Sequence, residues 1–434
     1  MTGRRPILPV FAGLLFGSLA VAGDPPVSPE NRLPPDTVRV GGFGERPEWS
    51  HDGTKLLFVG QPMGEAFELD LTTGLTRART RHFTHHGFTR ANYLPNGDLL
   101  LAGPAETFDR TDPAARLKAR ENCTLFVLPA AGGPPVSLGV LAAEGPAVSR
   151  TRPRIAWTER DLQDPTRPRN SGRIYVAEIE SRDGRPTLAN RRLVFDSRRL
   201  PFDLGRASIE TQDFVPPDDD ELLFTVYQIG DRANTDTYAV DLTTGEFRNL
   251  TRSPDYYDEP EGVYPHGRSV LVEHHLTSGK PWGLSDLYEL KLDGSGEMRR
   301  LTRFTDVPGF KATQGVISDD GRKLCFQMGK SGDEAGVGYG FFVTDLEAAA
   351  ARFGPFESYA VDALPGRRLA DRYAAAQAAG APLPQFSREP DAAGMSLENA
   401  YAVQRAWARS AFGGPDGAGF GGVKGGVVTA GGQA

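Results

Sequence analysis

Histidines are the residues of this chain best suited to hold a transition metal, and they occur in two groups. His82, His85 and His86 precede one apolar segment, and His274 and His275 follow another. Imidazole nitrogen is a common ligand of zinc, copper and iron. Two interpretations follow: the fold brings His85, His86 and His274 together as a metal site, or they are exposed loop histidines. No strict ligand spacing supports the metal site.

Charged and amide side chains form a second set of candidates, and they recur at or just before the first strand-like segment of the repeated units described below. A polar ring of this kind would bind a peptide, a sugar or a cation, whereas the alternative is ordinary solvated turns. Because a central channel is the main concavity of a ring-shaped repeat protein, we expect the ligand site at its mouth. The predicted ligand-binding residues are Arg46, Glu48, His86, Glu210, Asp213, Glu259, Glu261, Lys311 and Gln314.

Other catalytic motifs find little support in the sequence. A serine hydrolase of the α/β class needs Gly-x-Ser-x-Gly at a strand-to-helix turn, and the C-terminal part of the sequence contains no such motif. The glycines of Gly336–Gly340 resemble a phosphate loop, but the strand-like Phe341–Val343 follows where a helix is required. We therefore expect a β-hairpin turn there and assign no catalytic residue.

Two short segments are nearly identical and indicate a repeat architecture. Asp70–Gly74 and Asp241–Gly245 both read Asp-Leu-Thr-Thr-Gly, and each follows a strand-like apolar run. Asp52-Gly53 and Asn96-Gly97 are typical of hairpin turns between apolar strands. Six units of this kind recur about every 45 to 55 residues, which is the period of four-stranded propeller blades. Closing such blades into a ring removes exposed sheet edges.

The units resemble the TolB-like propeller repeat, in which Pro-x-Trp-Ser-x-Asp-Gly precedes an apolar strand and a later strand ends in Asp-Leu-x-Thr-Gly and Leu-Thr. Pro47–Gly53 matches the first part, and Asp241–Gly245 with Leu250-Thr251 matches the second. The resemblance covers roughly residues 37–349 and implies an all-β, six-bladed β-propeller, a fold that hosts many functions. The strand-like Thr37–Val40 has no blade of its own, so we expect it to complete the sixth blade and close the ring.

The N-terminus has the features of a secretory signal. Arg4 and Arg5 precede an apolar run, Ile7–Val21, and Ala20–Ala22 is a small-residue cleavage site. The apolar run is shorter than the roughly 20 residues that span a bilayer. We therefore expect a signal peptide at 1–22, an extended linker at 23–36, and a periplasmic or secreted protein with no membrane span in the mature chain.

Charge and cysteine content narrow the class of protein further. The net charge of −7 argues against a nucleic-acid partner, because nucleic acid requires a basic face. Cys123 and Cys325 are the only cysteines, and an exported protein is able to pair them. Since Cys325 lies within a strand-like apolar segment and Cys123 begins a distant one, we expect two buried free thiols instead.

The composition changes after residue 350, where Ala-rich and then Gly-rich segments follow. Leu397–Gln404 and Gly419–Gly426 resemble the N-terminal portion of the 2-keto-4-pentenoate hydratase family, which is related to the fumarylacetoacetate hydrolases. The resemblance implies a divalent metal held by Glu-x-Glu and a further acidic residue, all of them later in that fold. We therefore expect 350–434 to be a truncated hydratase-like segment, partly helical or disordered, that arose by fusion or frameshift.

These features together favour an exported binding or scaffold protein that holds a protein, an oligosaccharide or a small ligand at the channel mouth, with no cofactor. The alternative is an enzyme that uses a divalent metal. One version is a polysaccharide lyase or hydrolase acting in the channel through His85, His86 and His274, as in metal-dependent lyases with this type of ring. The other version is hydratase activity in the C-terminal segment. The absence of the family's metal-binding Glu-x-Glu and further acidic residue from this segment argues against it.

Overall fold

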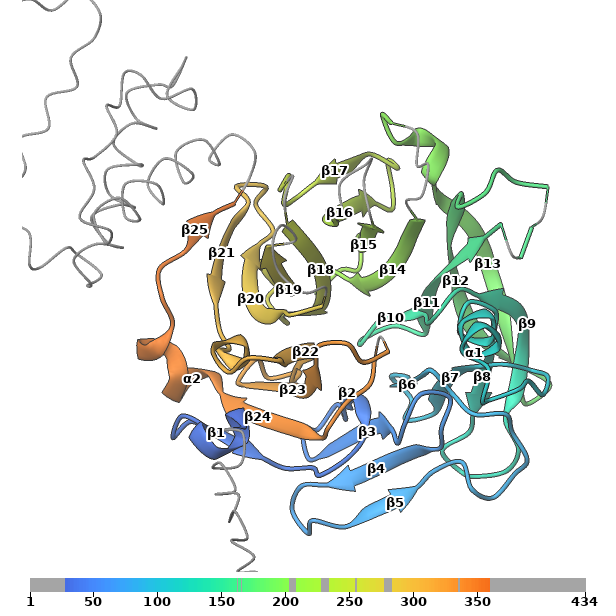
Figure 1. Ribbon diagram of the computed structural model, residues 1–434. Helices are drawn as coiled ribbons and strands as arrows, with labels where there is room; N and C mark the ends of the chain where they lie inside the picture. The colour runs from blue at the N-terminus through green and yellow to red at the C-terminus, as the bar shows by residue number, and fades with distance from the viewer. Residues whose placement is uncertain are drawn as a thin grey trace, which may run out of the picture.

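Six antiparallel sheets surround a central axis in the computed structural model, which confirms the predicted six-bladed β-propeller (Figure 1). The structure describes residues 28–359 except 162, 165, 203–207, 228–233, 254–255, 277–282 and 335. The predicted signal peptide and the hydratase-like matches at 397–404 and 419–426 lie outside the described residues. Within the described part of the chain, no helix is long and apolar enough to cross a membrane.

The first three blades follow one another along the chain, each running from the axis outward. Blade 1 contains β2 (Glu45–Trp49), β3 (Lys55–Val59), β4 (Ala66–Asp70) and β5 (Thr76–Ala78). Blade 2 contains β6 (Arg90–Tyr93), β7 (Leu99–Gly103), β8 (Cys123–Leu128) and β9 (Val136–Ala142), with the helix α1 (Pro113–Arg120) between β7 and β8. Blade 3 contains β10 (Ala147–Val148), β11 (Arg154–Arg160), β12 (Gly172–Arg182) and β13 (Arg185–Asp196).

The last three blades repeat the pattern with two additions. Blade 4 contains β14 (Ser208–Phe214), β15 (Glu221–Tyr227), β16 (Asp236–Asp241) and β17 (Phe247–Asn249). Blade 5 contains β18 (Tyr256–Val263), β19 (Ser269–Leu276), β20 (Asp286–Lys291), β21 (Glu297–Arg300) and a fifth strand, β25 (Glu357–Ser358). Blade 6 contains β22 (Phe310–Ile317), β23 (Lys323–Lys330), β24 (Phe341–Asp345) and β1 (Thr37–Arg39). Short helices connect these elements: α2 (Leu346–Ala349), η1 (Pro29–Arg32), η2 (Ser197–Arg199), η3 (Phe304–Asp306) and η4 (Ala350–Arg352).

The N-terminal strand closes the ring, as the sequence predicted. Strand β1 pairs antiparallel with β24, and Thr37 lies opposite Thr344 with their hydroxyl oxygens 2.8 Å apart. The first described strand of the chain therefore completes the last blade. Without it, β24 would present an unpaired edge to solvent.

The repeated sequence motifs form the same hydrogen bonds wherever they occur. Asp70 Oδ1 accepts from the backbone amides of Thr72 and Thr73, at 2.9 and 2.8 Å, and Asp241 Oδ1 accepts in the same way from the two threonines that follow it. The turn ends at a glycine with positive φ, 72° at Gly74 and 74° at Gly245, a conformation that glycine adopts without strain. The shared sequence therefore encodes a shared turn.

The threonine of each Leu-Thr pair fastens the outer edge of its blade to the start of the third strand. Thr251 Oγ1 donates to Asp236 at 2.7 Å and accepts from the amide of Thr237 at 3.2 Å. Thr302 makes the equivalent pair of bonds in blade 5, to Asp286 and from Leu287. Because these groups are buried, the bonds satisfy polar atoms that would otherwise be costly inside the sheet stack.

Apolar side chains fill the space between neighbouring blades. Trp49, Leu56 and Phe58 of blade 1 pack with Cys325 and Phe341 of blade 6, and all five are at most 2 % exposed. Cys123 and Cys325 are both buried free thiols, as predicted. This leaves the inner strands β2, β6, β10, β14, β18 and β22 around the axis (Figure 1). Polar residues from several of these strands line the cavities of the central channel.

The chain continues past residue 349 along the outside of the propeller. Strand β25 pairs with β21, so that Met298 lies opposite Glu357. Tyr359 packs edge-on against His274 and Tyr256 with ring centroids 4.5 and 5.3 Å away. Strand β25 and Tyr359, which lie within the predicted C-terminal segment 350–434, therefore contact blade 5.

Candidate ligand site in the central channel

Bulges in the inner strands aim polar side chains at the axis. The pairing register shifts in β2, β14, β18 and β22, each time near the middle of the strand. The extra residues include Arg46, Gln212, Glu261 and Gln314. Arg46 and Gln314 adopt positive φ, 54° and 53°, which is uncommon for residues other than glycine. Such bulges redirect side chains, and here they supply the channel with charged and amide groups.

The wider of two cavities in the channel has a volume of ≈ 610 Å³, within the range typical of small-ligand sites. Residues from five blades and from α1 contribute to its wall. Its charged and aromatic lining consists of Arg90, Arg120, Glu121, Glu144, Arg160, Tyr227, Tyr257, Glu259, Glu273, His275, Lys311 and Asp333. The cations and the anions are not evenly mixed within this set.

Arginine–glutamate pairs form the side of the wide cavity that belongs to blades 2 and 3. Arg120, at the end of α1, binds Glu144 through two nitrogens at 3.1 and 2.6 Å, and Arg160 of β11 pairs with Glu121. Burial opposes ionisation of Glu144, but Arg120, Arg160 and Arg46 outweigh it and lower its pKa to about 2. The Glu144 carboxylate therefore stays ionised at neutral pH.

Glutamates and tyrosines form the opposite side, on blades 4 and 5. The Tyr227 hydroxyl lies 2.6 Å from Glu210 and also bonds to Glu259, whose second oxygen accepts from Tyr257. Burial, and then the neighbouring Glu144 and Glu259, raise the pKa of Glu210 to about 8. Burial, and then Glu273, raise the pKa of Glu259 as well. Glu210 is therefore largely protonated at neutral pH.

Three glutamates of blade 5 converge most closely. Ligand oxygens of Glu259, Glu261 and Glu273 lie within 4.8 Å of one another. Glu273 accepts hydrogen bonds from Ser285 Oγ at 3.0 Å, from the backbone N–H of Gln314 at 2.9 Å and from the Thr313 hydroxyl. Burial opposes ionisation of Glu273, but Lys311 and these donors lower its pKa. Burial and Glu273 raise the pKa of Glu261 well above its usual range.

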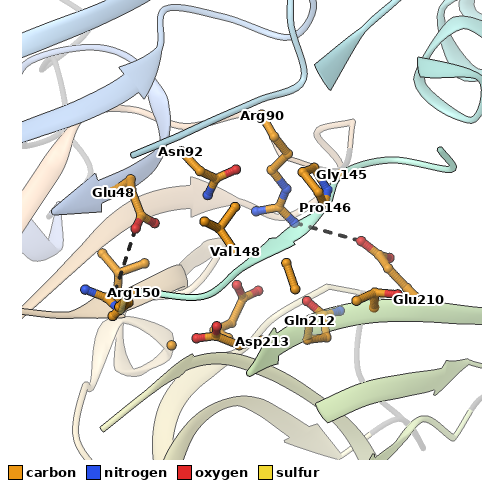
Figure 2. A pocket seen from close by; sticks show the side chains of 15 residues that line it. Glu48, Arg90, Asn92, Gly145, Pro146, Val148, Arg150, Glu210, Gln212 and Asp213 are labelled. Atoms are coloured by element: carbon orange, nitrogen blue, oxygen red, sulfur yellow. Dashed lines mark ion pairs between the residues drawn. The ribbon is translucent and has the colours of Figure 1, made fainter. Parts of the chain in front are cut away.

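The narrower cavity, of ≈ 70 Å³, lies on the other side of Arg90 and has room for a few water molecules at most (Figure 2). Figure 2 shows Arg90 directed toward Glu210 and Arg150 directed toward Glu48, with ion-pair distances of 3.9 and 3.8 Å. Burial raises the pKa of Asp213 to about 7 despite the nearby Arg150. Burial likewise raises the pKa of Glu48.

The structure distributes the predicted ligand-binding residues over both cavities rather than around one mouth. Glu259, Lys311 and Gln314 line the wide cavity, and Glu48, Glu210, Asp213 and Glu261 line the narrow one. Arg46 is buried near them and donates to the carbonyl of Thr89 at 2.9 Å. His86 lines neither cavity, and its carbonyl accepts from Arg110 at 2.6 Å.

The histidines considered as metal ligands occupy different places. His85 lies 3.4 Å from Glu65 of the blade 1 hairpin and packs against Phe88. His274 lies inside blade 5, with Nδ1 2.5 Å from Asp258 and its ring stacked on Tyr256. Among the described residues, the group able to hold a metal contains Glu259, Glu261 and Glu273 and no histidine.

Several lining residues were not expected from the sequence. Tyr257 and Glu259 lie opposite His275 and Glu273 in the β18–β19 register, so the second strand also faces the channel. Successive side chains of a strand point to opposite faces, so Glu273 and His275 share one face and His274 lies on the other. With β18 known to be the innermost strand, this alternation would have placed Glu273 and His275 toward the channel. Arg120 comes from a helix inserted in a loop, and no sequence pattern links such a helix to the channel.

Comparisons with known proteins found no match in sequence and only distant likenesses among solved structures. No protein family matches the sequence, and no curated protein matches it. Similar solved structures include TolB from Acinetobacter baumannii, at 16% identity over 69% of this chain and 67% of that one, with a TM-score of 0.36. An oligogalacturonate lyase in complex with manganese is 16% identical over 72% and 91% of the two chains, with a TM-score of 0.40. The gluconolactonase XC5397 from Xanthomonas campestris is 13% identical over 71% and 88%, with a TM-score of 0.43. The chain's own six sheets make it a six-bladed β-propeller, and TolB and related propellers are among its structural neighbours.

Proposed function

We propose that the chain is a binding protein that takes a basic side chain of a peptide segment into the wide cavity. The observation that supports this is the arrangement of charge in that cavity. The arginines on blades 2 and 3 are paired with Glu144 and Glu121, whereas the glutamates on blade 5 lie with tyrosines rather than arginines. A ligand ammonium or guanidinium group would lie against Glu259 and Glu273. The faces of Tyr227 and Tyr257 would add cation–π attraction.

The arginine side gives the same ligand a second anchor. Arg120 and Arg160 would bind a carboxylate or a backbone carbonyl of the peptide, because each guanidinium carries five N–H donors. The volume of ≈ 610 Å³ suits one or two residues of an extended peptide. Export to the periplasm or outside the cell, predicted from residues 1–22, belongs to this proposal and is tested by cell fractionation.

Calorimetry with short peptides tests the proposal. The peptide Gly-Lys-Gly is the probe, and the same peptide with norleucine in place of lysine is the neutral control. Glu259→Gln should weaken binding of Gly-Lys-Gly by about tenfold, since it removes a charged partner. The matched control is Glu246→Gln, an exposed glutamate in the β16–β17 turn. Equal binding of the lysine and norleucine peptides contradicts the proposal.

A second candidate is a metal-dependent lyase or hydrolase acting on oligosaccharides in the same channel. It is favoured by the convergence of Glu259, Glu261 and Glu273, because carboxylate oxygens suit magnesium, calcium and manganese. Metal analysis of the purified protein separates the two: stoichiometric metal that is lost in Glu261→Gln supports the enzyme.

A further inference from the structure

Hydrogen-bonded side chains around Arg90 lie between the two cavities of the channel. Arg90 is the one residue found in the described linings of both. Its guanidinium donates to Gln314 Oε1 at 2.8 Å and lies 3.9 Å from Glu210, and Gln314 donates in turn to Glu261 at 3.0 Å. These four residues, here called the septum, come from blades 2, 4, 5 and 6.

Further hydrogen bonds join the wide side to the narrow side around the septum. Tyr227, which lines the wide cavity, bonds to Glu210, which lines the narrow one. Gln212 of the narrow cavity donates to Glu259 of the wide cavity at 3.2 Å. Paired polar groups therefore lie where the two cavities adjoin.

Packing and backbone geometry hold the septum in place. A side-chain carbon at Gly145 would lie only 2.3 Å from Arg90 Cγ, so the arginine stem runs directly against the blade 3 backbone. Gln314 occupies its bulge with a φ of 53°, a strained conformation for glutamine. Strain of this kind persists only where the surroundings fix the residue, and here it aims the amide at Arg90.

We propose that Arg90 is a specificity-determining residue that forms the floor of the ligand site. Its charge and its position limit how far a ligand reaches from the wide cavity, and they keep a second cationic group away from Glu210 and Glu261. The class of ligand in this inference rests on the proposed function. The closure of the channel does not, because it is argued only from the contacts of the septum. Removing the guanidinium joins the two cavities and exposes the second carboxylate pair.

Thiol alkylation tests closure without any ligand. Val148→Cys places a thiol in the narrow cavity, while the native Cys123 and Cys325 are buried. Val148 is half-buried, so neutral iodoacetamide already reaches this thiol to some extent. It should modify the thiol about tenfold faster when Arg90→Ala is added, because the wide cavity then gives a second route of access. The matched control is Arg116→Ala, which breaks an exposed ion pair to Glu334 and lines neither cavity. An unchanged rate in the Arg90→Ala background overturns the inference.

Amines of different length test the effect on specificity. Propylamine carries one cationic group, and 1,10-diaminodecane carries two that reach both glutamate pairs only when the channel is open. Arg90→Ala should tighten binding of the diamine by about tenfold and leave propylamine within about threefold. Gln314→Gly, which relieves the positive φ while removing the amide, should act in the same direction and keeps the test informative if Arg90→Ala does not fold.

The two experiments separate the proposals. If no amine binds but alkylation accelerates, the proposed ligand class is wrong and Arg90 still closes the channel. If amines bind and neither the alkylation rate nor the preference for the diamine changes, the floor role is wrong while the proposed function stands.

Discussion

Glu45 offers the sharpest test of how burial controls charge in this propeller. It lies at the start of β2, is 1% exposed, and neither carboxylate oxygen has a hydrogen-bond partner among the described residues. The nearest cation is Arg46, with Nη1 3.9 Å away. Burial raises the pKa of Glu45 from 4.5 to about 7, although Arg46, Arg120 and Arg90 favour its ionised form.

This pKa predicts how stability depends on pH. Between pH 4.5 and pH 7 the folded protein retains a proton on Glu45 that the unfolded chain has released. The unfolded state binds fewer protons in that range, so the stability contributed by the protonated group is fully present below pH 4.5 and is lost as the pH rises to about 7. Since each pKa unit corresponds to 1.36 kcal/mol, the total loss is about 3 kcal/mol.

The substitution Glu45→Gln isolates this contribution because glutamine is neutral at every pH. We expect Glu45→Gln and the unsubstituted protein to differ by less than about 1 kcal/mol at pH 5, and Glu45→Gln to be more stable by about 3 kcal/mol at pH 8. Urea unfolding followed by the fluorescence of the buried Trp49 and Trp157 measures both values. Glu106→Gln, at an exposed position, is the control. Parallel pH profiles for Glu45→Gln and the unsubstituted protein would refute the reasoning.

Three further predictions concern the fold. Thr251→Val should lower the free energy of unfolding by about 1–3 kcal/mol in the same urea titration, since it removes one hydrogen-bond donor from the buried Asp236. Thr243 is exposed, so the control Thr243→Val should have little effect. Gly87→Ala should lower the free energy of unfolding by more than about 3 kcal/mol, because its new side-chain carbon would lie 1.8 Å from the Met63 carbonyl oxygen. Gly74→Ala has a similar φ and open space around it, so it should lower the free energy of unfolding by only about 1 kcal/mol. Equal losses would show that φ alone governs both sites. Deleting residues 28–40 removes β1 and should lower the melting temperature by roughly 5 °C or more in calorimetry, and an unchanged melting temperature would mean that closure by β1 adds no stability.

Local patterns carried enough information to predict the architecture. Asp70–Gly74 and Asp241–Gly245 specify the same turn through one carboxylate, and the Leu-Thr pairs specify the same edge contact. Such bonds join residues close in sequence, so they can be read from the sequence. The spacing of the repeats then predicted six blades, and the unpaired Thr37–Val40 predicted the closing strand. Polar residues on inner strands were expected at the channel because every propeller places those strands around its axis.

The channel's chemistry was decided by the tertiary structure. Bulges in β18 and β22 direct Glu261 and Gln314 to positions that a regular strand would not give them. Arg90 meets Gln314 and Glu210 only because ring closure places blades 2, 4 and 6 around one axis. The pKa of Glu210 likewise depends on burial and on Glu144 from another blade. Contacts of this kind join residues that are far apart in the chain, and no local pattern encodes which of them face each other. The sequence by itself determined the strands, the turns and the number of blades, whereas the pairing of charges across the axis, and with it the division of the channel, depended on the closed ring.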